Sequence, residues 1–364
     1  MKPEIDSKQG FPHFMLKEIY EQPAVSQRCL DLYFPVTFHP SPFFSDLNQI
    51  HILACGTSLH AGLVAQHWFE QLAGVPTIVR SASEFQVSPL PTIPGTLTIA
   101  VTQSGETADT IAALKLAQSR QMTSSRLLAI TNQDDSAIAK IADRTMITPA
   151  GSEIGVAATK TFLAQLMAFC CLALEIAYLR QRLDHSQLER SLTSLRQLPH
   201  QIEAVLQQSS AIAHVATTIQ QAGSVIVLGS GINYAIALEG ALKLKETTYL
   251  HAEGYAAGEF LHGSIALLDA KIPVIAIAPL GETPAIVMKT AQKAKATGSH
   301  VIGITPNSDI DFWDSRLPIP NVEEWLSPMS TVIPLQLLAY HIAISRKLDV
   351  DRPRNITKSL RDLT

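Results

Sequence analysis

The feature that most constrains this chain is an internal duplication, because a repeated unit is expected to fold the same way each time it occurs. A strand-like run, a glycine turn and a helical pattern occur at "HILACGTSLHAGLVAQHWFEQLAG" and again at "SVIVLGSGINYAIALEGALKLKETTY". Four shorter correspondences follow in the same order: "ASEF" with "AGEF", "TIAVTQSGETA" with "VIAIAPLGETP", "LLAITN" with "VIGITPN", and "FLAQLMAF" with "IPLQLLAY". These ordered matches indicate two copies of one unit.

Each copy alternates short β-branched runs with longer helical segments, and this alternation is typical of a parallel sheet covered by helices. We therefore predict an α/β fold with two duplicated domains, each a parallel sheet flanked by helices in a flavodoxin-like three-layer sandwich. The predicted organisation is an N-terminal arm over 1–45, a first domain over 46–182, a helical connection over 183–222, a second domain over 223–345 and a tail over 346–364.

Composition excludes several classes of protein. A net charge of −4 without a long basic run argues against a nucleic-acid partner, which requires many cations on phosphates. The four cysteines follow neither a disulfide nor a zinc pattern, and the N-terminus has no apolar core of signal-peptide length, so we expect a cytoplasmic protein without a metal. The apolar stretch "TFLAQLMAFCCLALEIAYLR" contains Gln165 and Glu175 and predicts a buried helix rather than a membrane span.

The loop "TQSGET" carries the clearest chemical signal. It follows a predicted strand and precedes a predicted helix, where ligands bind in parallel sheets. The hydroxyls of Thr102, Ser104 and Thr107 and the amide of Gln103 are neutral donors beside the amide groups of a helix N-terminus. Simple helix capping by one of these residues is the alternative, but it needs only one side chain. The loop therefore predicts a phosphate site.

Three further loops lie at positions where a ligand could bind. The second copy has "APLGET" in place of "TQSGET" and lacks the first two hydroxyls and the amide. We therefore expect the second copy to support the fold without binding a phosphate. "CGTS" would bring Ser58 close to the same ligand, whereas Cys55 has no neighbouring histidine and predicts a buried small residue. "GSGINY" lacks the third glycine of a dinucleotide fingerprint because Tyr234 stands there, so no nicotinamide cofactor is expected.

Titratable residues are densest in "EGALKLKETTYLHAEGYAAGEFLHG". Glu239 and Lys243 are four residues apart on one helix, which is typical of a surface ion pair. Glu246 lies on the same helical face, and a carboxylate beside lysines is a candidate proton shuttle. His262 precedes a glycine in a loop, which favours a histidine that works at a site. Lys358 alone carries no signal beyond a solvated terminal lysine.

Taken together, these motifs resemble the isomerase half of the glutamine–fructose-6-phosphate amidotransferases, which is built from two sugar isomerase (SIS) domains. The resemblance runs through almost the whole chain, from "HFMLKEIYEQP" through "CGTS", "ASEF", "TQSGETADT", "EIGVAATK", "ALEGALKLKE", "HAEGYAAGE" and "PLQLLAYH" to "DVDRPRNITKS". The related stand-alone glucosamine-6-phosphate deaminases share this architecture. The implied substrate is therefore a small-molecule sugar phosphate.

The resemblance also implies a role for each matching residue. The phosphate of fructose 6-phosphate would be bound by Thr102, Gln103, Ser104 and Thr107. The sugar would be contacted by Ser58, Val156 and Ala158. Lys358 would form a Schiff base with the open-chain ketose. Glu246 would move the proton between C1 and C2, with Lys243 beside it. His262 would assist ring opening from the neighbouring subunit, so a homodimer is implied.

The chain departs from the family pattern in places. The family enzyme begins with a glutaminase domain whose cysteine follows the initiator methionine, whereas Lys2 follows Met1 here. The chain as given is therefore expected not to release ammonia from glutamine. Ser264 stands where proline is usual and Leu261 where lysine is common, which affects the loop around His262.

Several functional readings remain open. The first is interconversion of fructose 6-phosphate and glucosamine 6-phosphate with free ammonia, with deamination favoured by mass action. Plain aldose–ketose isomerisation of a hexose 6-phosphate is an alternative. The chain could also be the isomerase part of a longer synthase, since "SKQGFPHFM" resembles the end of an interdomain linker. A sugar-phosphate sensor is a fourth reading, although a sensor would have no use for Lys358 and Glu246.

Overall fold

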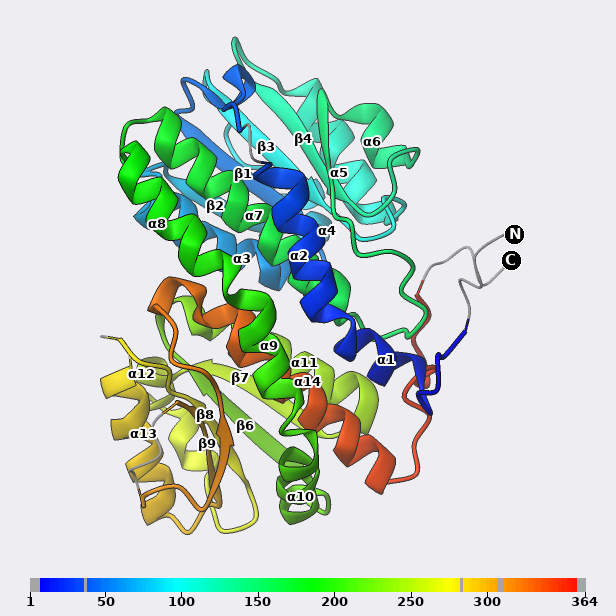
Figure 1. The fold of residues 1–364 in the computed structure, drawn as a ribbon, viewed down its shortest axis with the longest axis vertical. Helices are drawn as coiled ribbons and strands as arrows, with labels where there is room; N and C mark the ends of the chain where they lie inside the picture. Colours follow the sequence, from blue (N-terminus) through cyan, green and yellow to red (C-terminus); the bar gives the residue numbers. More distant parts are fainter. Residues whose placement is uncertain (1–6, 36–37, 282–283, 307–310, 359–364) are drawn as a thin grey trace. The chain divides into compact units, whose positions relative to one another are not determined.

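The computed structural model describes residues 7–35, 38–281, 284–306 and 311–358. The chain divides into two compact units, and each is described by itself. Of the described residues, unit 1 takes those in 7–23, 152–159 and 197–358, and unit 2 takes those in 24–151 and 160–196. Each unit contains one five-stranded sheet. Figure 1 shows the ribbon of the chain with its main helices and strands labelled.

Unit 2 contains a parallel sheet of strand order β2-β1-β3-β4-β5. Its strands are β1 (Gln49–Ala54), β2 (Thr77–Ser81), β3 (Thr96–Val101), β4 (Arg126–Thr131) and β5 (Arg144–Ile147). Its helices are η1 (Pro42–Phe44), α3 (Gly56–Gln71), α4 (Ala82–Val87), α5 (Ala108–Ser119), α6 (Ala137–Ile141), α7 (Lys160–Leu179) and α8 (His185–Arg196), together with most of α2 (Gln22–Tyr33).

Unit 1 contains a parallel sheet of order β10-β9-β8-β6-β7. Its strands are β6 (Ser224–Gly229), β7 (His251–Ala256), β8 (Val274–Ile277), β9 (Val301–Thr305) and β10 (Ser315–Pro318). Its helices are α1 (Phe14–Tyr20), α9 (Leu198–Leu206), α10 (Ser209–Ile219), η2 (Gly231–Asn233), α11 (Tyr234–Thr248), α12 (Ala257–Phe260), η3 (Ser264–Leu267), α13 (Pro284–Ala296), η4 (Glu324–Leu326) and α14 (Ser327–Ser345).

The two sheets confirm the predicted duplication. Read from β7, the order β7-β6-β8-β9-β10 repeats β2-β1-β3-β4-β5, with the second strand of each copy at one edge. In the second copy, the loop after β8 contains Glu282 and Thr283, which lie outside the described residues. The segment predicted to connect the copies is helical, and it is shared between the units: α8 belongs to unit 2, whereas α9 and α10 belong to unit 1.

Each sheet has helices on both faces, because alternate residues of a strand point to opposite sides. In unit 2, Leu53 and neighbouring residues pack with α4, α5 and α6 in one apolar cluster. On the other face Gly62 of α3 lies so close to Ile52 that a Cβ would be 2.9 Å from its side chain. In unit 1, α12 and α13 cover one face, and α11 and α14 pack together at Gly240 and Leu335. Figure 1 shows these layers.

Helix α7 fulfils the prediction of a buried helix. It is long and apolar enough to cross a membrane, but 83% of its most apolar window is buried inside the protein. Phe169 packs edge-on against Phe69 of α3, with ring centroids 6.1 Å apart. No other helix in the described ranges meets the length and hydropathy of a membrane span. We therefore assign α7 to the core.

Candidate active site

The predicted phosphate loop lies at the carboxyl end of β3 and leads into α5. Thr107 occupies the N-cap position of α5, but its hydroxyl bonds to that of Thr102 at 2.6 Å instead of to an amide of the first turn. Ser104 Oγ accepts a hydrogen bond from the amide of Glu106 at 3.2 Å. Simple capping by Thr107 is therefore not what the structure contains, and the four predicted side chains are together in one short loop.

Gly105 allows the sharp turn of this loop. Its φ is +69°, in the left-handed region that favours glycine. A Cβ at this position would be 2.1 Å from Ser136 Oγ, so the loop also packs against the segment that follows β4. The backbone amide of Asn132 donates to the backbone carbonyl of Gln103 at 3.0 Å, which fixes the loop from the same side. The hydroxyl-rich turn is thus held by a hydrogen bond and close packing with its neighbours.

Ser58 lies in the first turn of α3, which follows β1. Strands β1 and β3 are hydrogen-bonded neighbours with Ala54 opposite Val101, so their carboxyl ends lead into adjacent loops, as predicted. The Ser58 hydroxyl accepts a hydrogen bond from Gln165 Nε2 of α7 at 3.0 Å. Burial raises the pKa of the nearby Cys55 thiol, which fits the predicted structural role better than that of a nucleophile.

The ion pair on α11 is not at the surface, so the prediction of a surface pair was wrong. The side chains of Glu239 and Lys243 are both fully buried, and Lys243 Nζ lies 3.3 Å from Glu239 Oε1. The same Nζ lies 2.5 Å from Glu246 Oε2, whose side chain is 22% exposed. Burial alone lowers the pKa of Lys243, but the two carboxylates outweigh it, and the pKa lies above its usual range. Lys243 therefore remains an ammonium beside the Glu246 carboxylate.

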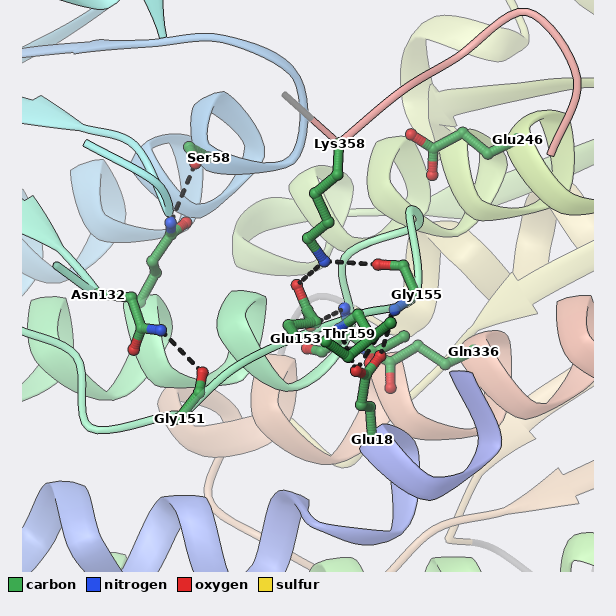
Figure 2. A network of polar contacts seen from close by, with 12 residues as sticks. Glu18, Ser58, Asn132, Gly151, Glu153, Gly155, Thr159, Glu246, Gln336 and Lys358 are labelled. Carbon is green, nitrogen blue, oxygen red and sulfur yellow. Dashed lines mark hydrogen bonds and ion pairs between the residues drawn. The ribbon is translucent and has the colours of Figure 1, made fainter. Parts of the chain in front are cut away.

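Lys358, which had no signal of its own, is held in a structured site. Its Nζ donates to Glu153 Oε2 at 2.7 Å and to the carbonyl of Gly155 at 2.5 Å. The side chain of Glu153 is fully buried, and that of Lys358 is 18% exposed. Figure 2 shows Lys358 reaching from the tail to this loop, and Glu246 pointing from α11 toward the tail segment. A lysine with these partners is oriented rather than solvated.

Two carboxylates of unit 1 hold this arrangement in place. Glu18 of α1 is 1% exposed and accepts hydrogen bonds from the amides of Ile154 and Gly155. Asp351 accepts hydrogen bonds from the first two amides of α1 at 3.0 Å and 2.9 Å, and its carbonyl accepts one from Val156 at 3.1 Å. The described residues of the predicted arm thus form α1, α2 and η1, and α1 ties the loop at 153–156 to the tail. Figure 2 shows Glu18 of α1 beside this loop.

The remaining predicted residues occupy different places. Val156 and Ala158 lie on the same loop as Glu153 and are partly buried. His262 follows α12, and its side chain is exposed. The structure therefore brings together the phosphate loop with the Ser58 turn in unit 2, and Lys358 with Val156 in unit 1.

Sequence analysis missed Glu153, Glu18 and Asp351. "EIGVAATK" and "HFMLKEI" were noted only as family motifs, and no periodicity marks an acid that binds backbone amides from another part of the chain. No binding role was predicted for Gln165 and Gln336, yet both are buried donors: Gln336 Nε2 donates to the carbonyl of Thr159 at 3.4 Å. The described ranges contain no group of three or more His, Cys, Asp or Glu side chains placed to hold a metal ion.

The chain contains two parallel sheets with the same strand order, and this arrangement defines a duplicated α/β protein. The chain belongs to the SIS domain family, whose domain pattern matches residues 43–175 and 218–346. Two separate matches agree with the duplication of the sheets.

Known relatives and solved structures extend this likeness. The chain is 53% identical to the glutamine–fructose-6-phosphate aminotransferase (isomerizing) of Synechocystis sp., over 97% of this chain and 60% of that protein. It therefore spans three fifths of that relative's length. The C-terminal domain of glucosamine-fructose-6-phosphate aminotransferase from Francisella tularensis has a TM-score of 0.91 and 35% identity, covering 95% of this chain and 99% of that one. Glucosamine-6-phosphate deaminase from Thermotoga maritima shares the fold, with a TM-score of 0.75 and 22% identity over 95% and 99% of the two chains.

Proposed function

We propose that this chain interconverts fructose 6-phosphate plus ammonia and glucosamine 6-phosphate plus water. The likeness to the Francisella tularensis domain supports the proposal, because that domain is matched over nearly its whole length. The observation that carries it is the position of Lys358, whose amine is oriented by Glu153 and Gly155 beside the predicted sugar contact Val156.

The phosphate is proposed to bind at the loop from Thr102 to Thr107. Phosphate oxygens can accept hydrogen bonds from several hydroxyls and amides, and the N-terminus of α5 favours negative charge. Ser58 would contact the sugar from the adjacent turn. Because hydrogen bonds and close packing already hold the loop in this turn, binding would have little to order.

The carbonyl chemistry is proposed for Lys358. Its neutral amine attacks C2 of the open-chain ketose and expels water, and ammonia then displaces the lysine from the imine carbon. A proton moves from C1 to C2, and the proton of the C1 hydroxyl passes to the imine nitrogen, which leaves an aldehyde at C1 and an amine at C2. Deamination runs through the same steps in reverse.

Glu246 is proposed to carry that proton. Its partly exposed carboxylate can reach a ligand, while Lys243 stays charged and can stabilise the negative charge that develops when C1 loses a proton. Val156 and Ala158 are proposed to contact the sugar. We further propose that His262 assists ring opening in the site of a second copy, and that the protein is a cytoplasmic homodimer.

The decisive experiment supplies glucosamine 6-phosphate to the purified chain and measures ammonia and fructose 6-phosphate together. Equal amounts of both are expected. Lys358→Met should abolish the release, whereas Lys271→Met, at an exposed lysine, should leave it unchanged. If neither product appears and fructose 6-phosphate turns into glucose 6-phosphate, the chain is a plain aldose–ketose isomerase. The Lys243–Glu246 pair also fits that second candidate, because proton transfer between C1 and C2 is common to both reactions.

A further inference from the structure

The carboxylate of Glu153 is fixed at both oxygens, and one of them touches the amine of Lys358. Oε2 lies 2.7 Å from Nζ, and Oε1 accepts a hydrogen bond from the amide of Thr159 at 2.9 Å. The side chain of Glu153 has no exposed surface. This carboxylate therefore stands in one geometry relative to Nζ.

A charged lysine cannot attack a carbonyl, because its nitrogen has no free electron pair. One proton must leave Nζ before or during attack, and the acceptor must lie within hydrogen-bond distance. Lys358 donates to two groups among the described residues: the Gly155 carbonyl, which is a very weak base, and the Glu153 carboxylate. Of these two described acceptors, the carboxylate is the one that can take up the proton.

We propose that Glu153 is the general base and acid for imine formation at Lys358, an inference that rests on the proposed function. Nζ transfers one proton to Glu153 Oε2 as its electron pair forms a bond to C2, and the C2 oxygen becomes a hydroxyl by taking up a second proton from Nζ, which keeps its third. Glu153 then returns its proton to that hydroxyl, which leaves as water while the C2–N double bond forms. No oxidant or reductant is involved, and water is the only product besides the imine.

Glu18 of α1, which binds the same loop, provides a matched control. It is also a buried carboxylate and binds the loop through the amides of Ile154 and Gly155. Lys358, in contrast, contacts Glu153 and Gly155. Substituting Glu18 disturbs the loop and removes a buried charge, but it leaves the acceptor at Nζ in place.

The test measures the rate of imine formation with fructose 6-phosphate, trapped by borohydride and followed by the mass of the Lys358 peptide. A transfer from Nζ to Glu153 neither takes up a proton from solvent nor releases one. The rate should therefore be nearly constant from about pH 6 to about pH 8. A rate that rises about tenfold per pH unit would show that hydroxide removes the proton, and would overturn the role of Glu153 without any substitution.

Variants supply the second arm. Glu153→Gln should slow trapping by about 100-fold or more, and Glu153→Ala should recover part of the rate with added formate. Glu18→Gln should keep the flat pH profile and show no response to formate. Trapping by Glu153→Gln at the unmodified rate, in protein that still binds inorganic phosphate, would refute the proposal.

The outcomes separate the two claims. If the unmodified protein forms no imine at Lys358, the proposed function fails. If the unmodified protein does form this imine, but the Glu153 variants have the same pH profile and show no rescue by formate, only the role of Glu153 fails. If the variants do not fold, the pH profile of the unmodified protein decides.

Discussion

Replacing Lys243 by methionine tests whether the buried charges of α11 stabilise unit 1 as the structure indicates. Methionine keeps the length and helix propensity of lysine, so the main change is the loss of the ammonium. Glu239 is fully buried 3.3 Å from that ammonium, and Glu246 is 2.5 Å from it. Both carboxylates lose a counter-charge in a site of low dielectric.

Removing one partner of a buried ion pair costs about 3–5 kcal/mol. In a domain of this size each kcal/mol lowers the melting temperature by about 2–4 °C. Lys243→Met should therefore lower it by about 6–20 °C. Adding Glu239→Gln should recover part of the loss, because a neutral amide no longer needs the ammonium.

Scanning calorimetry of the unmodified chain, the single variant and the double variant measures these shifts. Lys245→Met is the matched control, since Lys245 is exposed on the same helix and should shift stability by less than about 0.5 kcal/mol. If Lys243→Met melts within 2 °C of Lys245→Met, on the order of a single kcal/mol, the buried pair contributes little and the reasoning is refuted.

Three further predictions concern unit 2. Burial lowers the pKa of His51 from 6.5 to about 4, so the unfolded chain binds a proton at His51 before the folded protein does. The free energy of unfolding should therefore fall by about 3 kcal/mol in all as the pH drops from 6.5 toward 4. His51→Gln should flatten the acid side of a profile of urea midpoint against pH, and an unchanged slope would contradict this. Ser104→Ala should weaken inorganic phosphate binding, measured by calorimetry, by roughly 10-fold or more, whereas the exposed Ser119→Ala should not. Gly105→Ala should lower the free energy of unfolding by more than the about 1–2 kcal/mol that a left-handed backbone costs, because the added Cβ meets Ser136. Adding Ser136→Gly should remove the part of the loss that comes from this clash. Full stability of the single variant would contradict the geometry.

The duplicated fold could be predicted because each copy repeats local signals. Strand-like runs, glycine turns and helical periods depend on residues close in sequence, and they recur in order. The phosphate loop could be predicted for the same reason, since all its side chains lie between Thr102 and Thr107. The buried helix α7 could be predicted from its apolar length and from Gln165 and Glu175, which interrupt it.

The buried pair of Glu239 and Lys243 could not be recognised, because spacing places two residues on one helical face without saying whether that face is covered. The covering elements, such as α14 with Leu335, lie about ninety positions later in the chain. The partners of Lys358 were missed for a related reason: Glu153 and Lys358 are separated by 205 positions, and their contact depends on the complete fold of unit 1.

The family assignment and the geometry answer different questions. The SIS match fixes the fold and its duplication, whereas the contacts of Lys358 and Glu246 suggest where the carbonyl and proton steps would occur. The motif "HFMLKEI" forms α1, whose hydrogen bonds join the loop at Gly155 to Asp351 of the tail. These bonds give a physical reason for that motif, because α1 holds the surroundings of Lys358 in place.

The most direct test of the account is to find which lysine forms the imine. The protein is incubated with fructose 6-phosphate, reduced with borohydride, digested and analysed by mass spectrometry. The account predicts a hexose phosphate adduct on Lys358, formed with the phosphate loop intact and lost in Ser104→Ala at low substrate concentration. An adduct confined to other lysines, or none at all, would contradict it.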